Sequence, residues 1–261
     1  MIEIPLSCRT QTGGNLPFDA PLNPPWKGGL PDPVPPFLMG VRGDWDLETQ
    51  SIQTNWLREL QSAPIIAVIR SPDIQIGRKM AIAIALGGIK SIEITANSDR
   101  PWELIELLKA ELPECSIGTG TVLSLADVRN AVACGAEYIF TPHLDTSLVR
   151  MAIDSNIPIV PGALTPTEII TAWQTGATAV KVFPIQAVGG TDYLRVLQGP
   201  IGQIPLIPSG GVTVNNAPDF IAAGAIAVGL SGCLFPQAEI DHEDWMSITT
   251  RASNLIARIH Q

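Results

Sequence analysis

The sequence predicts a (β/α)8 barrel with an N-terminal helix, and three observations support this fold class. Short apolar segments alternate with amphipathic ones, which is typical of a parallel sheet covered by helices on both faces. The chain has 261 residues, of which 46% are hydrophobic and 16% charged, so most of it can build a large core. A glycine precedes an apolar strand four times, at Gly88, Gly135, Gly176 and Gly224. Eight strands with this repeat favour a closed barrel over an open doubly wound sheet.

Residues 1–44 differ from the rest, because nine of the 23 prolines lie within the first 40 residues. Such a segment favours an extended conformation over helix or sheet. We expect a disordered Pro/Gly-rich extension, or translation from a start upstream of the true one, with Met39 as a candidate. A proline motif that binds a partner is the alternative. The barrel is expected to occupy residues 45–261.

The first regular element is a helix over residues 47–61. Helix-start chemistry supports two later boundaries, at Ser124 with Asp127 and at Thr165-Pro166 with Glu168. No Gly-x-Gly-x-x-Gly motif follows the first strand, which weakens a dinucleotide-binding alternative. Strands are expected at 65–70, 91–95, 116–122, 138–142, 158–162, 179–184, 205–211 and 227–232, with helices between them that include 73–86, 101–111, 124–134 and 213–223.

The charge and the composition exclude several classes of protein. A net charge of −9 and a pI of about 4.8 argue against a general nucleic-acid partner. No apolar run approaches about 18 residues, so no membrane partner is expected. Four cysteines without a Cys-x-x-Cys motif indicate reduced thiols and a cytoplasmic protein, and three dispersed histidines argue against a His-rich zinc site.

The fifth residue after each repeat glycine is Glu93, Phe140, Lys181 or Gly229, and these four side chains should point the same way. Two of them are ionisable, opposite in sign and embedded in apolar segments. Burying a charge costs several kcal/mol unless the charge is paired or used. The repeat therefore predicts a catalytic lysine and a carboxylate inside the barrel.

Lys181 lies in Ala-Val-Lys-Val-Phe, and apolar surroundings favour the neutral amine that attacks carbonyl groups. Glu93 would serve as a general acid/base, with a pKa raised by burial. The structural alternatives are a lysine paired to a carboxylate at the barrel rim, and a Glu93 carboxylate paired with Arg70 or Lys181.

Polar residues gather where the strands end, which is where barrels place their function. We expect the loops after strands seven and eight to bind phosphate, because glycines let backbone N–H groups approach an anion. These glycines could also simply make turns, and His143 could contact substrate or be an ordinary loop residue. The expected substrate-binding residues are Arg70, Asn97, Thr121, Pro142, Phe183 and Ser209, and the expected phosphate-binding residues are Gly210, Gly211, Ser231 and Gly232.

Six short motifs occur along the predicted barrel. They are Glu93-Ile-Thr, Gly118-Thr-Gly-Thr121-Val-Leu, Thr141-Pro142, Ile159-Val-Pro-Gly162, Lys181-Val-Phe-Pro184 and Ser209-Gly-Gly211. Together they resemble the 2-keto-3-deoxy-6-phosphogluconate (KDPG) aldolase / 4-hydroxy-2-oxoglutarate (KHG) aldolase family, and the similarity runs from about residue 55 to the C-terminus. The resemblance implies a metal-independent class I aldolase on a (β/α)8 barrel, typically a homotrimer, and no cofactor is expected.

The resemblance implies Lys181 as the Schiff-base lysine, Glu93 as the general acid/base and Thr121 as a contact of the pyruvate part. Ser209, Gly210, Gly211 and the loop at 231–232 would hold the distal phosphate. Two positions depart from the family pattern. Asn97 stands where gluconate-type enzymes usually carry Arg, as in the galactonate type, and the usual Gly-x-Gly-Ser reads Gly229-Leu-Ser231-Gly232.

The function expected from the resemblance is cleavage of the phosphorylated keto acid KDPG to pyruvate and glyceraldehyde 3-phosphate. Cleavage of 4-hydroxy-2-oxoglutarate to pyruvate and glyoxylate would be a second activity. Three alternatives stay open at this point: the galactonate epimer as the substrate, a phosphosugar isomerase or epimerase without a Schiff base, and a non-catalytic barrel that binds a phosphorylated ligand.

Overall fold

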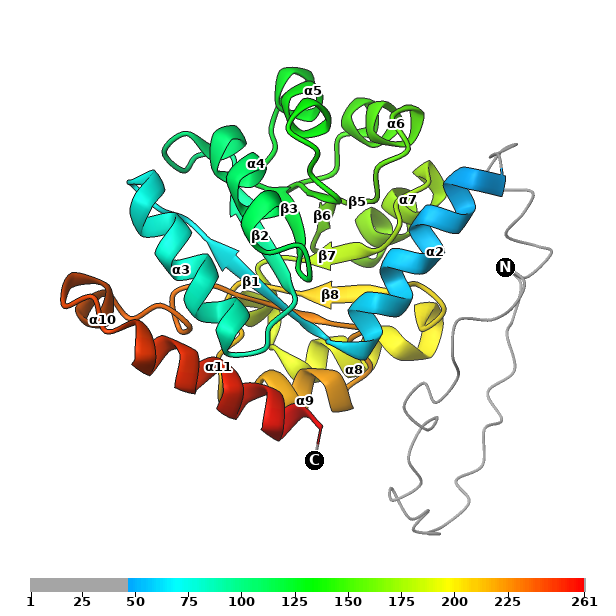
Figure 1. The fold of residues 1–261 in the computed structure, drawn as a ribbon. Coiled ribbons are helices and arrows are strands. Elements are labelled where there is room, and N and C mark those ends of the chain that lie inside the picture. Colours follow the sequence, from blue (N-terminus) through cyan, green and yellow to red (C-terminus); the bar gives the residue numbers. More distant parts are fainter. Residues whose placement is uncertain (1–46, 261) are drawn as a thin grey trace, which may run out of the picture.

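The computed structural model describes residues 47–260, which form a barrel of parallel strands surrounded by helices (Figure 1). The predicted extension at 1–44 and its boundary with the barrel lie outside the described residues. The helices are α2 (Leu47–Ser62), α3 (Ile74–Leu86), α4 (Pro101–Glu111), α5 (Leu125–Ala133), α6 (Thr146–Asp154), α7 (Pro166–Thr175), α8 (Thr191–Ile201), α9 (Ala217–Ala222), α10 (Gln237–Asp241) and α11 (Trp245–Ile259), with a 3-10 turn η1 (Ile185–Val188). The strands are β1 (Ile65–Ile69), β2 (Ser91–Thr95), β3 (Ser116–Gly120), β4 (Ile139–Phe140), β5 (Ile159–Val160), β6 (Gly162–Ala163), β7 (Val180–Val182), β8 (Leu206–Pro208) and β9 (Val228–Leu230).

The strands close into a barrel through two parallel sheets. The first has the order β5-β4-β3-β2-β1-β9 and the second the order β6-β7-β8. Only Pro161 separates β5 from β6, so these two are halves of the fifth barrel strand. A bridge between Ser209 and Gly229 then joins the end of β8 to β9. The predicted eight-stranded barrel is confirmed, with each strand at its expected place in the chain.

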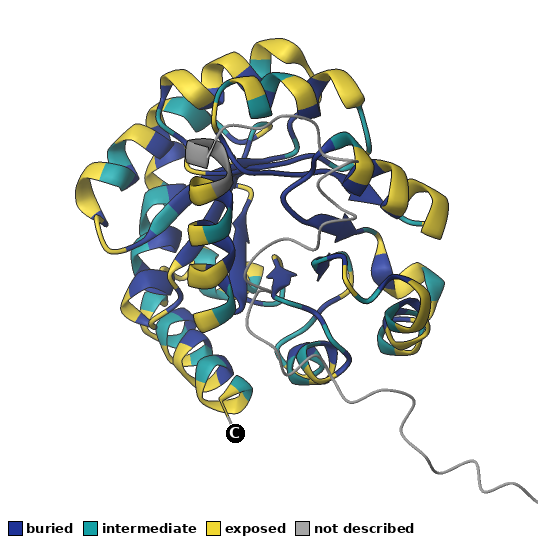
Figure 2. Ribbon diagram, turned by 90° about the vertical axis from the view of Figure 1, so that its right-hand side faces the viewer, coloured by how far each residue is buried: buried dark blue, intermediate teal, exposed yellow. Residues whose placement is uncertain are grey.

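The larger part of the core lies between the strands and the ring of helices (Figure 2). The last helix, α11, completes this ring by packing on α3. Thr249 Oγ1 donates a hydrogen bond to the carbonyl oxygen of Ala83 at 2.9 Å. Gly87 lies so close to α11 that an added Cβ would be 2.5 Å from the Cβ of Ala252. The two ends of the barrel sequence are thus joined by close helix packing.

A second, aromatic cluster fills the barrel interior and connects it to α2. The rings of Trp56 and Tyr138 have centroids 5.2 Å apart, and those of Tyr138 and Phe140 lie 5.7 Å apart. Trp56 belongs to α2, whereas Tyr138 directly precedes β4 and Phe140 is its last residue. Because α2 runs directly into β1, it closes the N-terminal end of the barrel with this tryptophan. The cluster also includes Leu57, Leu60, Ile66, Val68, Val160, Ala179, Ile207 and Ala227.

The predicted helix starts are confirmed in detail where the capping chemistry is strongest. Ser124 with Asp127, and Thr165 with Glu168, both form capping boxes. The expected helix over 213–223 is shorter than predicted, because side-chain bonds between Thr213 and Asn216 hold a turn there and α9 begins after it. Several strands also end earlier than the apolar pattern suggests.

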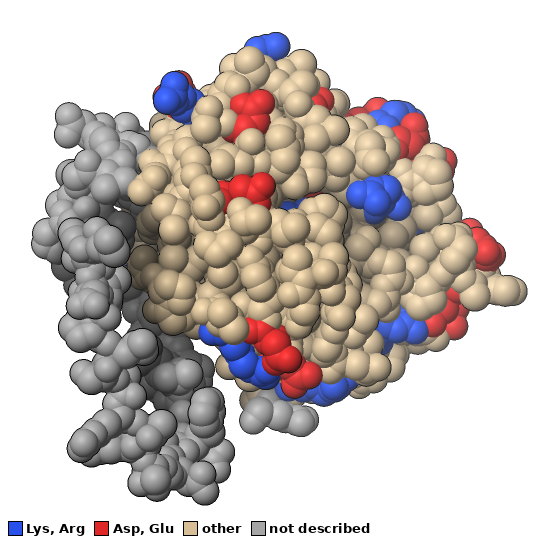
Figure 3. Space-filling view, turned by 180° about the vertical axis from the view of Figure 1, so that it is seen from behind, with Lys and Arg blue, Asp and Glu red and all other residues tan. Residues whose placement is uncertain are grey.

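The surface of the described chain is mixed in charge. On the face shown in Figure 3, Lys and Arg side chains are scattered among Asp and Glu rather than gathered into a basic patch. None of the helices within residues 47–260 has the length and apolar character that crossing a membrane requires. The three described cysteines are free thiols, and two of them, Cys115 and Cys134, are buried.

Candidate active site

The four repeat residues form one layer inside the barrel. Glu93, Phe140, Lys181 and Gly229 lie on β2, β4, β7 and β9, which are the second, fourth, sixth and eighth barrel strands. Alternate strands of such a barrel contribute the side chains of a common interior layer. The sequence repeat therefore has a structural meaning, since it places a lysine and a carboxylate at the same height.

Lys181 lies among aromatic rings rather than among acids. Its Nζ is 4.9 Å from the ring centroid of Phe183 and 5.8 Å from that of Phe140, and only 7% of the residue is exposed. Its strand neighbours in the register are Gly162 and Ile207, so no bulky polar group stands beside it. Among the described residues, Lys181 forms no ion pair within 4.0 Å. The amine is thus held by apolar contacts and is left available for chemistry.

Glu93 is buried to 2% exposure, and its Oε1 has no hydrogen-bond partner among the described residues. Burial raises the pKa of this carboxyl group, while the positive charges of Lys181 and Arg70 partly offset the rise. The side chain extends over Gly120, where an added Cβ would be 1.7 Å from Oε1. A carboxyl group that is desolvated and faces a lysine suits proton transfer.

Arg70 and Asn97 lie at the rim, directly beyond the C-terminal ends of β1 and β2. Arg70 Nε donates a hydrogen bond to Asn97 Oδ1 at 3.2 Å. Both side chains are exposed, and the guanidinium is near enough to Glu93 to influence the carboxyl group. The structure therefore brings two predicted substrate-binding residues into direct contact with each other.

Thr121 follows β3 with φ at +58°, in the left-handed region that β-branched residues rarely occupy. Such conformations cost about 1–3 kcal/mol and often mark functional sites. Pro142 lies across the barrel, with its carbonyl group packed against Gly162 at the fifth strand. His143 is exposed beyond it. Thr121, Pro142 and Phe183 thus stand near the lysine and carboxylate layer, and His143 stands further out.

The loop at 209–211 after β8 has the geometry expected of an anion cradle. Gly210 and Gly211 have φ values of +81° and +100°, so they adopt a backbone that side chains disfavour. Gly210 packs on the ring of Phe183, which connects this loop to the lysine. Among the hydrogen bonds of the described residues, the N–H groups of both glycines have no acceptor. Free N–H groups of this kind are suited to binding a phosphate.

Ser231 and Gly232 follow β9 and are exposed. The adjoining Cys233 Sγ is 3.5 Å from the carbonyl oxygen of Val212, so this loop reaches the one after β8. Ser209 and Gly229 also meet, because the bridge between them joins the two strands. The four predicted phosphate-binding residues therefore belong to neighbouring loops at one edge of the barrel mouth.

Two residues of the candidate site have no role that the sequence alone predicts. Phe140 is a repeat position in the sequence, and in the structure its ring lies 5.8 Å from Lys181 Nζ. Gly120 is part of the Gly118-Thr-Gly-Thr121 motif, and in the structure it provides the space that the Glu93 carboxyl group occupies. Their signals were the repeat itself and the spacing of Gly118-Thr-Gly-Thr121.

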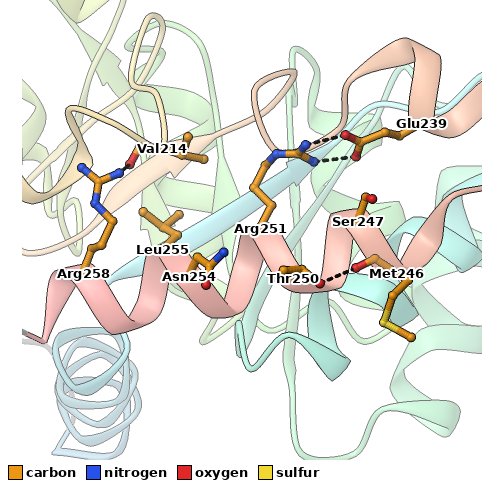
Figure 4. A pocket seen from close by; sticks show the side chains of 9 residues that line it. All are labelled: Val214, Glu239, Met246, Ser247, Thr250, Arg251, Asn254, Leu255 and Arg258. Atoms are coloured by element: carbon orange, nitrogen blue, oxygen red, sulfur yellow. Dashed lines mark hydrogen bonds and ion pairs between the residues drawn. The ribbon is translucent and has the colours of Figure 1, made fainter.

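No group of three or more His, Cys, Asp or Glu side chains within the described part of the chain could hold a metal ion. A surface pocket of about 400 Å³ does occur, but it lies along α11 on the outside of the barrel (Figure 4). Its Arg251 pairs with Glu239, and its Arg258 donates to the carbonyl oxygen of Val214. Because its charged groups are satisfied internally, this pocket is a poor candidate for the active site.

The candidate site thus combines a buried lysine and a buried carboxylate inside a (β/α)8 barrel, an arrangement typical of enzymes. Comparisons with known proteins agree with this class. The family model described as KDPG and KHG aldolase matches residues 57–251. The chain belongs to this aldolase family and is a lyase.

Characterised relatives and solved structures cover most of the chain. The 2-dehydro-3-deoxy-phosphogluconate aldolase of Haemophilus influenzae is 36% identical over 74% of this chain and 89% of its own. The aldolase of the same name from Pseudomonas aeruginosa is 32% identical, and the match covers 82% of this chain and 96% of that protein. The KDPG aldolase of Legionella pneumophila has been solved with pyruvate captured as a covalent carbinolamine. It is 25% identical to this chain, with a TM-score of 0.71, and the match covers 81% of this chain and 99% of that one. A native KDPGal structure is 28% identical with a TM-score of 0.65, and the match covers 76% of this chain and 92% of that one.

Proposed function

We propose that this protein is a class I aldolase that cleaves KDPG to pyruvate and glyceraldehyde 3-phosphate through a Schiff base on Lys181. The observation that carries the proposal is the interior layer, in which the Lys181 amine lies among aromatic rings at the same height as Glu93. The covalent pyruvate carbinolamine in the Legionella relative supports the same chemistry here.

The reaction follows from the two groups. The Lys181 amine, once it has released its proton, adds to the C2 ketone, and the resulting carbinolamine loses water to form an iminium ion. Glu93, directly or through a water molecule, removes the proton of the C4 hydroxyl group. The electrons of the C3–C4 bond then move into the iminium, which releases the aldehyde and leaves an enamine. Protonation of C3 and hydrolysis release pyruvate and restore the lysine.

The proposed binding groups lie around this layer. Thr121, Pro142 and Phe183 would surround the pyruvate part of the substrate. The free N–H groups of Gly210 and Gly211, together with Ser209 and the loop at 231–232, would hold the distal phosphate. The two ends of the substrate are thereby assigned to different sides of the barrel mouth.

Borohydride reduction in the presence of pyruvate tests the proposal. The wild-type protein should gain one stable adduct, mapped by mass spectrometry to Lys181. Lys181→Ala should gain none and should lose activity by several orders of magnitude. An adduct on Lys79, Lys90 or Lys109, or none at all, would exclude the proposed mechanism. An isomerase, an epimerase or a binding barrel would give no adduct in any variant.

The choice of substrate within the family is a further part of the proposal. Asn97, in place of the Arg usual in gluconate-type enzymes, and the KDPGal structure at 28% identity favour the galactonate epimer as a second candidate. The family description also names KHG aldolase, so 4-hydroxy-2-oxoglutarate is a third. Parallel assays of these three compounds decide among them, and activity that survives EDTA would support a metal-independent reaction.

We further propose a cytoplasmic homotrimer. A solved protein cage built by fusing symmetric oligomeric domains is 28% identical with a TM-score of 0.69, which supports self-association. The free thiols of the described cysteines suit a reducing compartment. Light scattering after size-exclusion chromatography measures the oligomer, and cell fractionation measures the location.

A further inference from the structure

The loops that follow β1 and β2 are joined by a buried set of hydrogen bonds. The backbone N–H of Ser71 donates to Ser98 Oγ at 3.2 Å, and the N–H of Asp99 donates to the Ser71 carbonyl oxygen at 2.9 Å. Ser98 Oγ is also 3.1 Å from Thr95 Oγ1. Ser71 and Ser98 are 1% and 9% exposed. The neighbours of these serines, Arg70 and Asn97, therefore start from backbone positions fixed relative to each other.

The side chains of Arg70 and Asn97 meet above this joined backbone. The Arg70 Nε–H group donates to Asn97 Oδ1 at 3.2 Å. A guanidinium carries five N–H donors in a planar fork, so this contact uses one of them. Within the described part of the chain, the two terminal nitrogens of Arg70 have no acceptor. Asn97 fixes the plane of the guanidinium and leaves these terminal nitrogens to a ligand.

The side of Arg70 on which Asn97 lies indicates which anionic group of the substrate the guanidinium would bind. Arg70 directly follows β1, and β1 lies between β2, which carries Glu93, and β9, which leads into the loop at 231–232. Asn97 lies beyond β2, so its amide holds the guanidinium toward the Glu93 side and away from the β9 loop. The influence of the Arg70 charge on Glu93 agrees with this placement. The anion nearest to Glu93 and Lys181 would be the carboxylate next to the ketone carbon.

We propose that Asn97 is a positioning residue that acts through Arg70, so that the terminal nitrogens of Arg70 bind the C1 carboxylate of the keto acid. The inference rests on the proposed aldolase function and adds the group that binds this carboxylate. A planar fork matches a carboxylate through two parallel hydrogen bonds, but only when its plane is set correctly. The amide supplies that alignment without carrying a charge of its own.

The test uses the synthetic direction, in which pyruvate carries the carboxylate and glyceraldehyde 3-phosphate carries the phosphate. Asn97→Ala should raise KM for pyruvate roughly tenfold, the effect of losing one hydrogen bond to a charged group. It should leave kcat and KM for the aldehyde within about twofold. Arg70→Ala should raise KM for pyruvate further, and adding Asn97→Ala to it should then leave KM for pyruvate unchanged, because Asn97 acts on the C1 carboxylate only through Arg70.

Asn254→Ala is the matched control, because it also removes an exposed side-chain amide, but from α11 on the outside of the barrel. It should leave both KM values unchanged. Thermal unfolding of each variant separates an effect on the fold from one on the site. A rise in KM for the aldehyde instead of pyruvate would overturn the inference by assigning Arg70 to the phosphate. Equal effects of Asn97→Ala with and without Arg70 would also overturn it. Absence of any pyruvate adduct on wild-type Lys181 would instead reject the aldolase function itself.

Discussion

Gly120→Ala tests how closely the barrel positions its carboxylate. A Cβ at this residue would be 1.7 Å from Glu93 Oε1, 2.3 Å from its Cδ and 2.8 Å from its Cγ. Real Cβ contacts are essentially never shorter than 3.0 Å, so Oε1 must move by at least the difference, about 1.3 Å. Glu93 is buried, so the interior offers little free space for the displaced group.

The size of the effect follows from this displacement. A misplacement of about 1 Å in a catalytic group lowers the rate about 100-fold, so kcat for cleavage should fall by roughly that factor. Overpacking the interior should also lower the free energy of unfolding by about 1–3 kcal/mol. The three atoms nearest to the added methyl group all belong to Glu93, so the pyruvate adduct on Lys181 should still form and be trapped by borohydride.

Steady-state kinetics, adduct mapping and thermal unfolding together measure these expectations. Gly199→Ala is the matched control, because a Cβ there meets nothing within 4 Å and the residue lies in α8. It should keep full activity and be neutral or more stable by up to about 1 kcal/mol. A Gly120→Ala enzyme with wild-type kcat and an unchanged pH profile would refute the placement of the Glu93 carboxyl group against Gly120.

Three further predictions concern stability and selectivity. The pKa of Glu93 is raised by burial, so its protonated form stabilises the fold at low pH, and this contribution is lost as the pH rises from about 4.5 through the folded-state pKa. Glu93→Gln should therefore gain Tm relative to wild type as the pH rises through that window, and a constant difference would contradict it. Trp56→Ala should cost about 3–5 kcal/mol in chemical denaturation, since it removes the aromatic contact with Tyr138; a loss below about 1 kcal/mol would show that α2 does not close the barrel. The kcat/KM values for the gluconate and galactonate epimers should lie within about 100-fold of each other, which corresponds to under about 3 kcal/mol. Asn97→Arg should shift their ratio toward the gluconate epimer. An unchanged ratio would show that Asn97 does not determine epimer selectivity.

The repeat made the fold and the centre of the site predictable. Each glycine marks where the chain turns into a strand, so the fifth residue after it reaches a fixed height in the barrel. That regularity alone predicts that Lys181 and Glu93 are interior residues, and both are buried in the structure. The starts of two helices could be predicted equally well, because Ser124 and Thr165 form their capping boxes with residues three positions away.

Contacts between distant segments were not predictable in the same way. The bond from Arg70 to Asn97 spans 27 residues and depends on the exact path of two loops. The contact of Trp56 with Tyr138 depends on how α2 crosses the barrel end. The space at Gly120 depends on the direction of one glutamate side chain. Hydrophobic periodicity reports which face is buried, but it carries no information about which buried groups meet.

The arrangement of the interior explains how the barrel tolerates two ionisable groups without a direct ion pair. The rings of Trp56 and Tyr138 pack against each other and against Phe140, which lies beside Lys181, so this aromatic cluster excludes water from the N-terminal end. At the other end of the strands, polar residues such as Arg70 and Asn97 are exposed to solvent. The positive charges of Lys181 and Arg70 lower the cost of an ionised Glu93 carboxylate without removing the effect of burial. Glu93 is thereby kept able to gain or lose a proton, whereas a close ion pair would hold it permanently ionised.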